Sequence, residues 1–356
     1  MNKFSQAYLA ARTALGDDAF AGAVAKQRAQ LLTLMADGGP AAAQSNHLGK
    51  LRQALKTAQY SLVAAGKPMA AGAQAIIDAA GTGAGKAERA ATVKMLKHLY
   101  HTKSAGGQAV WVYSPPKAYA KWIFDEVAGA DDPKLKAVLA QPEDEVYSET
   151  QRSVMSDALQ TARKVCLDAV AKLGEPTAAT LTIVRRYFGN TGSSADQLNT
   201  AAATLRGGYQ KIANACNAST VIISDEPGDR SGTGWEDWAF IYTAETMRVI
   251  YLQNAWLTKA AEATPSNQTP LFRCARTIIH ELSHKEVSTE DVVYGPRGLM
   301  VQGSGALTAD YALHNADSWA YFAMDLTGNL TGPDATNGIT ACTAIRAVPT
   351  RVLTVA

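Results

Sequence analysis

The sequence lacks the features of several large protein classes. Its 34 Lys and Arg residues nearly balance its 32 Asp and Glu residues, so the net charge is only +2. Such a balance gives no overall attraction to nucleic acid, and we predict no nucleic-acid partner. No apolar run approaches the roughly 18 residues of a membrane-spanning helix, so we predict no membrane span. At 47% hydrophobic residues, the chain is too apolar for general disorder.

Cysteine and export signals are also sparse. Polar residues interrupt the first 18 positions, so the apolar stretch of a secretory signal peptide is missing there. We therefore expect a protein that is cytoplasmic before export and is secreted by a non-Sec route. No Cys-x-x-Cys pair is present, which argues against a thiolate zinc knuckle. The four cysteines are Cys166, Cys216, Cys274 and Cys342.

The length of 356 residues suggests about two domains. Residues 1–140 are rich in Ala, Gln, Lys and Leu with helical spacing, and they predict a helical N-terminal segment. Residues 141–330 predict a second domain, and residues 331–356 a C-terminal tail without clear periodicity. Within the second domain, helices are predicted at residues 148–174, 194–216, 269–288 and 312–326, and β-leaning runs lie within residues 219–229 and 238–257. The run at residues 110–113 is compatible with a short strand.

The most informative motif is His-Glu-Leu-Ser-His at residues 280–284. On a helix, positions four apart share one face, so His280 and His284 can direct nitrogen atoms at one zinc ion. Glu281 lies beside them, where a carboxylate can take a proton from water. The motif therefore predicts a catalytic Zn²⁺ site whose third ligand lies elsewhere in the chain.

The downstream sequence narrows the choice of that third ligand. No glutamate follows Glu290, so a downstream glutamate ligand is excluded unless Glu286 or Glu290 serves, and the only later histidine is His314. Glu290 and Val287 also stand where the long metzincin motif requires histidine and glycine. The remaining downstream candidates are the aspartates Asp291, Asp310, Asp317, Asp325 and Asp334.

Several segments resemble one known family. STEDVVYG at residues 288–295 resembles the GTxDxxYG signature of the aspzincins, the deuterolysin-like and peptidyl-Lys zinc metalloendopeptidases. HNADSWAYF at residues 314–322 resembles the NAD-containing helix that follows this signature. RRYFG at residues 185–189 and VIYLQNAW at residues 249–256 resemble upstream segments of the same family. The resemblance extends over roughly residues 145–330.

The resemblance implies a role for each matching residue. His280, His284 and Asp291 would bind Zn²⁺, and Glu281 would act as the general base. Tyr294 would donate a hydrogen bond to the oxyanion, and Asp317 would accept one from a ligand histidine. The implied fold is an α+β zincin-like metalloprotease domain, mostly helical with a small sheet, preceded by the helical N-terminal segment. The resemblance also implies a disulfide between Cys166 and Cys216.

The chain departs from the family pattern at three points. Ser288 replaces the first glycine of the signature, and the six residues between His284 and Asp291 make a short turn. Asp317 is the alternative ligand if that turn does not return Asp291 to the metal. Lysine-specific members carry an acid three residues after the aspartate of the NAD motif, and Ala320 stands there. We therefore do not expect lysine specificity.

The predicted function is that of a zinc-dependent endopeptidase with a protein or peptide substrate, and we predict that it is a secreted bacterial effector or toxin. Two alternatives share the site: a zinc amidase that acts on cell-wall peptide, and a non-catalytic zinc-binding delivery protein. Residues 1–140 have two candidate roles. They form either an inhibitory pro-segment or a targeting module that contacts a secretion apparatus.

Overall fold

The computed structural model describes residues 3–36, 39, 46–51, 53–55, 68–104, 111–113, 123–140, 147–218, 220–225, 232–295, 299 and 309–330. By its contacts, the chain divides into two compact units. Unit 1 comprises Met1–Ser156 with Ser219–Leu257, and unit 2 comprises Asp157–Ala218 with Thr258–Ala356. The contacts thus group residues 219–257 with the N-terminal segment. The predicted tail at residues 331–356, which includes Cys342, lies outside the described residues.

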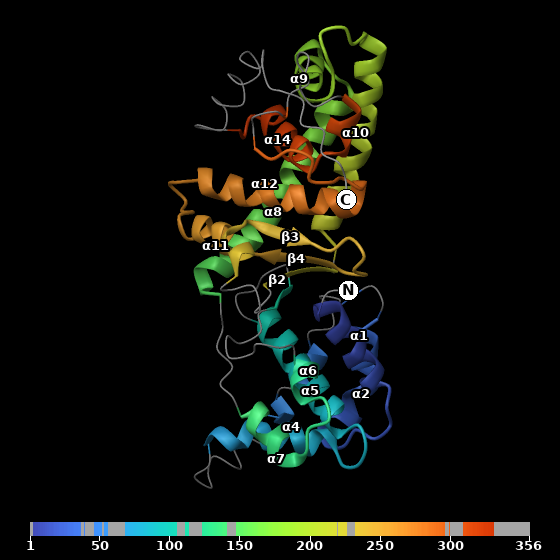
Figure 1. The fold of residues 1–356 in the computed structure, drawn as a ribbon, viewed down its shortest axis with the longest axis vertical. Coiled ribbons are helices and arrows are strands. Elements are labelled where there is room, and N and C mark those ends of the chain that lie inside the picture. The colour runs from blue at the N-terminus through green and yellow to red at the C-terminus, as the bar shows by residue number, and fades with distance from the viewer. Residues whose placement is uncertain are drawn as a thin grey trace. The chain divides into compact units, whose positions relative to one another are not determined.

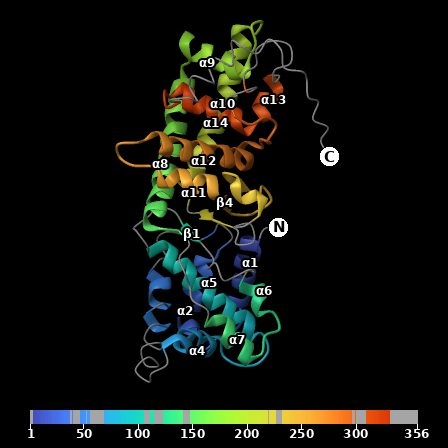
Figure 2. The ribbon, with the colours of Figure 1, turned by 60° about the vertical axis from the view of Figure 1, so that its left-hand side comes forward.

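Unit 1 is built from short helices and a sheet. Figure 2 shows its helices in blue, cyan and green. Asp131 caps the N-terminus of the helix at Asp132–Leu139, because its side chain accepts a hydrogen bond from the Lys134 backbone N–H. The helices are α1 (Lys3–Leu15), α2 (Gly22–Leu34), α4 (Pro68–Ala80), α5 (Lys86–Ser104), α6 (Ile123–Val127) and α7 (Asp132–Leu139).

The sheet of unit 1 has four strands in the order β1-β2-β4-β3. The strands are β1 (Trp111–Tyr113), β2 (Val221–Ser224), β3 (Ala239–Ile241) and β4 (Arg248–Leu252). The β1–β2 and β2–β4 pairs are parallel, and β3 pairs antiparallel with β4. The predicted small sheet is confirmed, and the structure shows that it is mixed and that the N-terminal segment supplies one of its strands.

The N-terminal helices and the sheet share one hydrophobic core. Ile222 of β2 and Val249 and Tyr251 of β4 belong to the same buried cluster as the helical residues Phe4 and Leu96. All five side chains are fully buried. A sheet face that is this apolar requires a cover, and residues of the N-terminal segment provide it.

Unit 2 is helical. Along the chain, the division between the units falls within α8 (Glu149–Gly174) and within α11 (Asn254–Ala261). The other helices are α9 (Ala178–Phe188), α10 (Ala195–Cys216), α12 (Thr269–Val287), α13 (Ala309–His314) and α14 (Ala316–Leu326). α12 packs against both α10 and α14, drawn in orange, yellow-green and red in Figure 1. The single helix predicted at residues 312–326 is divided at Asn315, whose backbone is extended.

Aromatic side chains pack α14 against α9 and α10. Phe322 meets Phe188 edge-on, with ring centroids 5.2 Å apart, and Tyr209 lies 5.1 Å from Trp319. The Tyr209 hydroxyl also donates to the Trp319 carbonyl oxygen over 2.7 Å. Trp319 and Phe322 are thus packing residues, and they hold the start of α14, where Asp317 lies.

The implied disulfide is not present in this structure. Cys166 on α8 and Cys216 on α10 are buried free thiols, as is Cys274. The two thiols interact electrostatically, and burial raises the pKa of each, so they pack as small apolar side chains. The pairing that the resemblance implied is therefore corrected.

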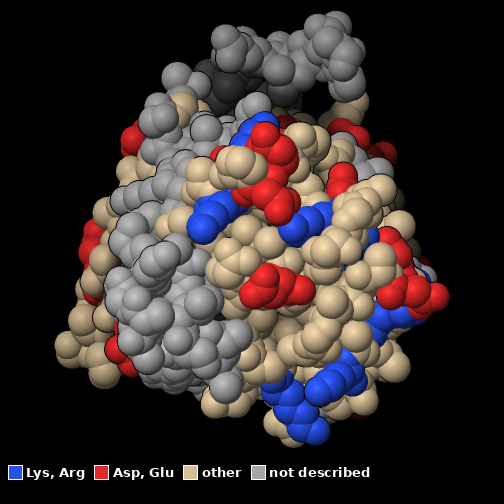
Figure 3. Space-filling view, turned by 90° about the horizontal axis from the view of Figure 1, so that it is seen from below, with Lys and Arg blue, Asp and Glu red and all other residues tan. Residues whose placement is uncertain are grey.

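The surface has no dominant charge in the view of Figure 3, where Lys, Arg, Asp and Glu are interspersed among uncharged residues. This agrees with the net charge of +2. Among the helices that the structure describes, none has the length and apolarity needed to cross a membrane.

Candidate active site

Helix α12 presents the His-Glu-x-x-His motif as predicted. The Nε2 atoms of His280 and His284 lie 3.2 Å apart, and an oxygen of Glu281 lies 4.0 Å from the His280 Nε2. His280 is 7% exposed and Glu281 is 4% exposed. A carboxylate this buried, next to two imidazoles that point at one position, is typical of a metal or proton-transfer site.

A tight turn returns the chain to the two histidines. α12 ends at Val287, and Ser288 adopts the left-handed conformation with φ 59° and ψ 44°. A glycine takes this conformation without a steric cost, which explains why the aspzincin signature has glycine at this position. Thr289 then directs its carbonyl oxygen at the His284 Nδ1 over 2.8 Å. Six residues are therefore enough to bring Asp291 back to the site.

Asp291 contacts both histidines. Its Oδ1 lies 3.0 Å from the His280 Nε2 and 3.4 Å from the His284 Nε2. The two nitrogens and this oxygen thus converge on one small region. Glu281 also belongs to a group of possible metal ligands with the two histidines. Asp291 is the better third donor, because its oxygen approaches both Nε2 atoms more closely than the Glu281 oxygen approaches His280.

The start of α14 orients the site from the other side. Asp317 accepts a hydrogen bond from the His280 Nδ1 over 2.6 Å, and its second oxygen accepts one from the Gly295 N–H over 2.7 Å. Its neighbour Asn315 accepts from the Val292 and Val293 N–H groups, each over 3.0 Å. These contacts connect the turn that carries Asp291 to the helix that carries Asp317.

The hydrogen bonds settle which nitrogen of each histidine faces the site. A carbonyl oxygen only accepts, so the His284 Nδ1 carries the proton that Thr289 binds. Asp317 holds the Nδ1 proton of His280 in the same way. Both Nε2 atoms are therefore available as ligands, the arrangement that metal-binding histidines usually show.

The carboxylates around the two histidines raise the pKa of both rings. Burial lowers the pKa of His280, but hydrogen bonds with Asp291 and Asp317 outweigh it and raise the pKa to about 10. Burial also lowers the pKa of His284, but hydrogen bonds with Asp291 and the Thr289 backbone outweigh it and raise the pKa. Burial raises the pKa of Asp291, but the two histidines hold it well below its usual range. These carboxylates now stabilise protonated histidines. A bound dication would take the place of those protons as the positive charge that the carboxylates face.

Glu281 and Tyr294 differ in their exposure. Burial raises the pKa of Glu281 to about 6. Tyr294 is 67% exposed and stacks on the His280 ring, with centroids 6.2 Å apart. Burial of its hydroxyl and a hydrogen bond with Asp291 raise the pKa of Tyr294. The phenol therefore stays protonated at neutral pH and can donate a hydrogen bond.

The donor set fits zinc. Two imidazole nitrogens and one carboxylate oxygen are three protein ligands, the number that catalytic zinc sites use while leaving one position for water or substrate. Residues 175–324 match the aspzincin family, described as lysine-specific metallo-endopeptidase. This segment matches an aspzincin domain. Aspzincins depend on zinc, so the match supports a zinc metallopeptidase.

One solved structure with similarity to this chain is a zinc peptidase from Grifola frondosa. It shares 21% sequence identity, and the match covers 50% of this chain and 96% of that chain with a TM-score of 0.35. No curated protein sequence matches the chain. The predicted resemblance to aspzincins is confirmed by the family match, which lies within the predicted residues 145–330.

The sequence-predicted residues of the aspzincin site lie together. His280, Glu281 and His284 come from α12, Asp291 and Tyr294 from the turn after it, and Asp317 from α14. Sequence reasoning missed Thr289 and Asn315, which fix the His284 ring and the Asp291 turn. Asn315 is the first residue of the NAD motif, so the motif held the signal for its position.

Proposed function

We propose that this zinc metalloendopeptidase holds its metal with His280, His284 and Asp291 and hydrolyses peptide bonds with Glu281 as general base. The observation that supports the proposal is the convergence of three donor atoms, 3.0–3.4 Å apart, next to a buried carboxylate. When bound, zinc polarises a carbonyl group and lowers the pKa of water. The protein groups supply the proton transfer and the hydrogen bonds.

Glu281 receives the proton of the attacking water and passes it to the leaving amine. Burial supports this role, because it raises the pKa of Glu281 to about 6, close to neutral pH. A general base works best when its pKa lies near the operating pH. The helix places the carboxylate one residue from His280, so both groups reach the same water.

Tyr294 and Asp317 act around the reacting carbonyl. The Tyr294 phenol donates a hydrogen bond to the carbonyl oxygen as negative charge develops there. Its exposure of 67% leaves it accessible to a substrate. Asp317 holds the His280 ring through Nδ1 and so keeps Nε2 directed at the site.

Ala320 bears on side-chain specificity. The family is described by its lysine specificity, but Ala320 stands where the lysine-specific pattern has an acid, and it is fully buried. We therefore propose that this chain does not select lysine, because a cation would find no carboxylate there. A peptide library would test this, and a dominant lysine at the cleavage position would contradict it.

Metal removal tests the function directly. Treatment with a chelator should abolish cleavage of a denatured protein, and one equivalent of zinc should restore it. Tyr294→Phe should retain zinc and lower kcat by about tenfold or more, because it removes one donor to the developing charge. Cleavage that persists after metal removal would contradict the proposal. Release of cell-wall fragments with intact protein substrates would favour the amidase alternative.

We also propose that the protein is exported and acts as an effector, with residues 1–140 in contact with the secretion apparatus. Fractionation of the producing cells tests this. Appearance of the protein outside the cell is expected. Retention inside the cell under all growth conditions would contradict it.

A further inference from the structure

Two hydroxyl groups connect the histidines of the site through atoms that do not face the metal position. The Ser283 hydroxyl donates a hydrogen bond to the His280 carbonyl oxygen over 2.7 Å, and its oxygen lies 2.6 Å from the Thr289 Oγ1. The Thr289 Oγ1 also lies 3.4 Å from the His284 Nδ1. We propose that Ser283 and Thr289 are a positioning pair that sets the affinity of the site for zinc. The inference rests on the proposed function, in which the two histidines and Asp291 hold the metal.

The direction of each hydrogen bond in this chain is fixed. A hydroxyl group has only one proton to donate. Ser283 gives its proton to the His280 carbonyl oxygen, so it accepts in its contact with Thr289, and Thr289 donates. The proton on the His284 Nδ1 faces both the carbonyl oxygen of Thr289, over 2.8 Å, and its Oγ1. The chain therefore leads from the His284 ring through two hydroxyls to the backbone of His280.

Burial makes the two hydroxyls depend on each other. Ser283 is 0% exposed and Thr289 is 4% exposed. A buried hydroxyl that loses its partner costs free energy, because no water takes the place of the lost bond. Removal of one hydroxyl therefore leaves the other unsatisfied and favours a rearrangement of the turn.

The pair joins the two segments that carry the metal donors. Ser283 lies on α12 between the two histidines, and Thr289 lies two residues before Asp291. The Ser283 carbonyl oxygen also accepts a hydrogen bond from the Thr289 backbone N–H over 3.4 Å. Backbone and side chain of Thr289 are thus both bound to one residue of the helix. A shift of Thr289 would move the carbonyl oxygen that orients His284 and the start of the turn that brings Asp291 to the site.

Substitutions that remove one hydroxyl test the proposal. Thr289→Val replaces the hydroxyl by a methyl group and keeps the backbone carbonyl oxygen, and Ser283→Ala removes the partner hydroxyl. Zinc affinity, measured by competition with a chelator, should fall by about tenfold in each variant, as is usual when the support of a ligand histidine is disturbed. The double variant should lose no more affinity than either single variant, because both act through one contact. Thr289→Ser keeps the hydroxyl and should restore the wild-type affinity.

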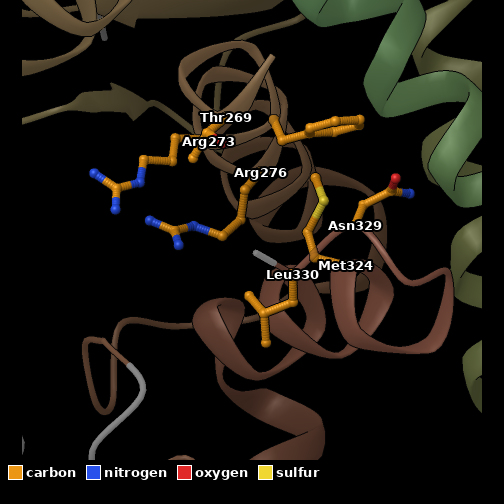
Figure 4. A pocket seen from close by; sticks show the side chains of 7 residues that line it. Thr269, Arg273, Arg276, Met324, Asn329 and Leu330 are labelled. Carbon is orange, nitrogen blue, oxygen red and sulfur yellow. The ribbon is translucent and has the colours of Figure 1, made fainter. Parts of the chain in front are cut away.

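The first half of α12 supplies a matched control. Thr277 is 7% exposed, and its hydroxyl donates to the Arg273 carbonyl oxygen of the same helix over 3.2 Å. This half of the helix faces the end of α14, and Figure 4 shows Arg276 and Met324 lining a small hollow there. Thr277→Val therefore removes a buried hydroxyl from α12 without disturbing the contact with Thr289, and it should leave zinc affinity unchanged.

A spectroscopic readout distinguishes positioning from general stability. Co²⁺ in place of Zn²⁺ gives visible absorption bands that depend on the arrangement of its ligands. These bands should shift in Ser283→Ala and Thr289→Val and should match the wild type in Thr289→Ser and Thr277→Val. A purely structural role would lower the melting temperature of the metal-free protein and leave the spectrum and the affinity unchanged. That result would overturn the proposal.

Metal binding needs no substrate, so the outcome is separate from peptidase activity. Weaker zinc binding by Ser283→Ala and Thr289→Val supports the pair even if no peptide is cleaved. Wild-type affinity in both variants overturns the pair, while cleavage of a peptide would still support the proposed function. A wild-type protein that binds no zinc would contradict both. Should Thr289→Val fail to fold, Ser283→Ala, which removes a single oxygen atom, decides the question.

Discussion

Deletion of residues 1–140 should unfold the sheet-bearing unit rather than release an inhibited enzyme. The deletion removes β1, which pairs with β2, and the helices that bury the sheet. Four sheet-region side chains, those of Ile222, Met247, Val249 and Tyr251, belong to the shared core and are at most 2% exposed. The deletion would expose their apolar face to water.

The magnitude follows from these four side chains. Full burial of one large apolar side chain contributes about 1.5–3 kcal/mol, so their exposure costs roughly 6–12 kcal/mol. The free energy of unfolding of a whole domain is about 5–15 kcal/mol. The loss is therefore as large as the stability that holds such a unit together.

The assay compares the full chain with residues 141–356 by near-UV circular dichroism, urea unfolding and peptide cleavage. The truncated chain should lack a cooperative transition for the sheet unit and should show no gain in activity. Trp111→Ala in the full chain offers a milder test, because loss of this buried side chain should cost about 3–5 kcal/mol. A truncated chain that folds cooperatively and cleaves faster than the full chain would refute the reasoning and support an inhibitory pro-segment.

Three further predictions concern unit 2. Asp291→Ala should leave the fold intact and weaken zinc binding by at least about tenfold, as measured by competition with a chelator; unchanged affinity would exclude Asp291 as ligand. Because the pKa of His280 is raised to about 10 in the metal-free protein, zinc binding at about pH 7 should release protons and tighten as pH rises, which calorimetry in buffers of different ionisation enthalpy measures. Gly208→Ala should lower the free energy of unfolding by about 1–3 kcal/mol, because its Cβ would lie 2.3 Å from Trp319. Gly207→Ala on the same helix has open space around its Cβ and should not lower the free energy of unfolding. Equal melting temperatures of the two variants would contradict this packing.

Local patterns in the sequence predicted the helices and the metal motif well. The helix at residues 148–174 agrees with α8, and the helix at residues 269–288 agrees with α12. Their periodicity is a property of neighbouring residues, so one sequence reveals it. Elimination left several downstream aspartates, and the resemblance alone singled out Asp291, whose Oδ1 lies near the Nε2 atoms of both histidines.

Long-range features were not predictable in the same way. The pairing of β1 with β2 joins residues more than a hundred positions apart, and no local pattern encodes such a partner. The break at Asn315 arises because its side chain accepts two backbone hydrogen bonds from the Asp291 turn, a tertiary interaction that overrides helical periodicity. The Cys166–Cys216 disulfide was implied by the resemblance alone, and the structure shows buried free thiols.

The most direct test of the account compares wild type with Glu281→Gln, a substitution that keeps the volume of the side chain and removes its ability to accept a proton. Both proteins are assayed for zinc content and for cleavage of the same peptide. We predict one zinc per chain in both and a loss of about 10²–10⁴-fold in kcat for the variant. A variant that binds zinc and cleaves at the wild-type rate would contradict the role of Glu281 and the mechanism built on it.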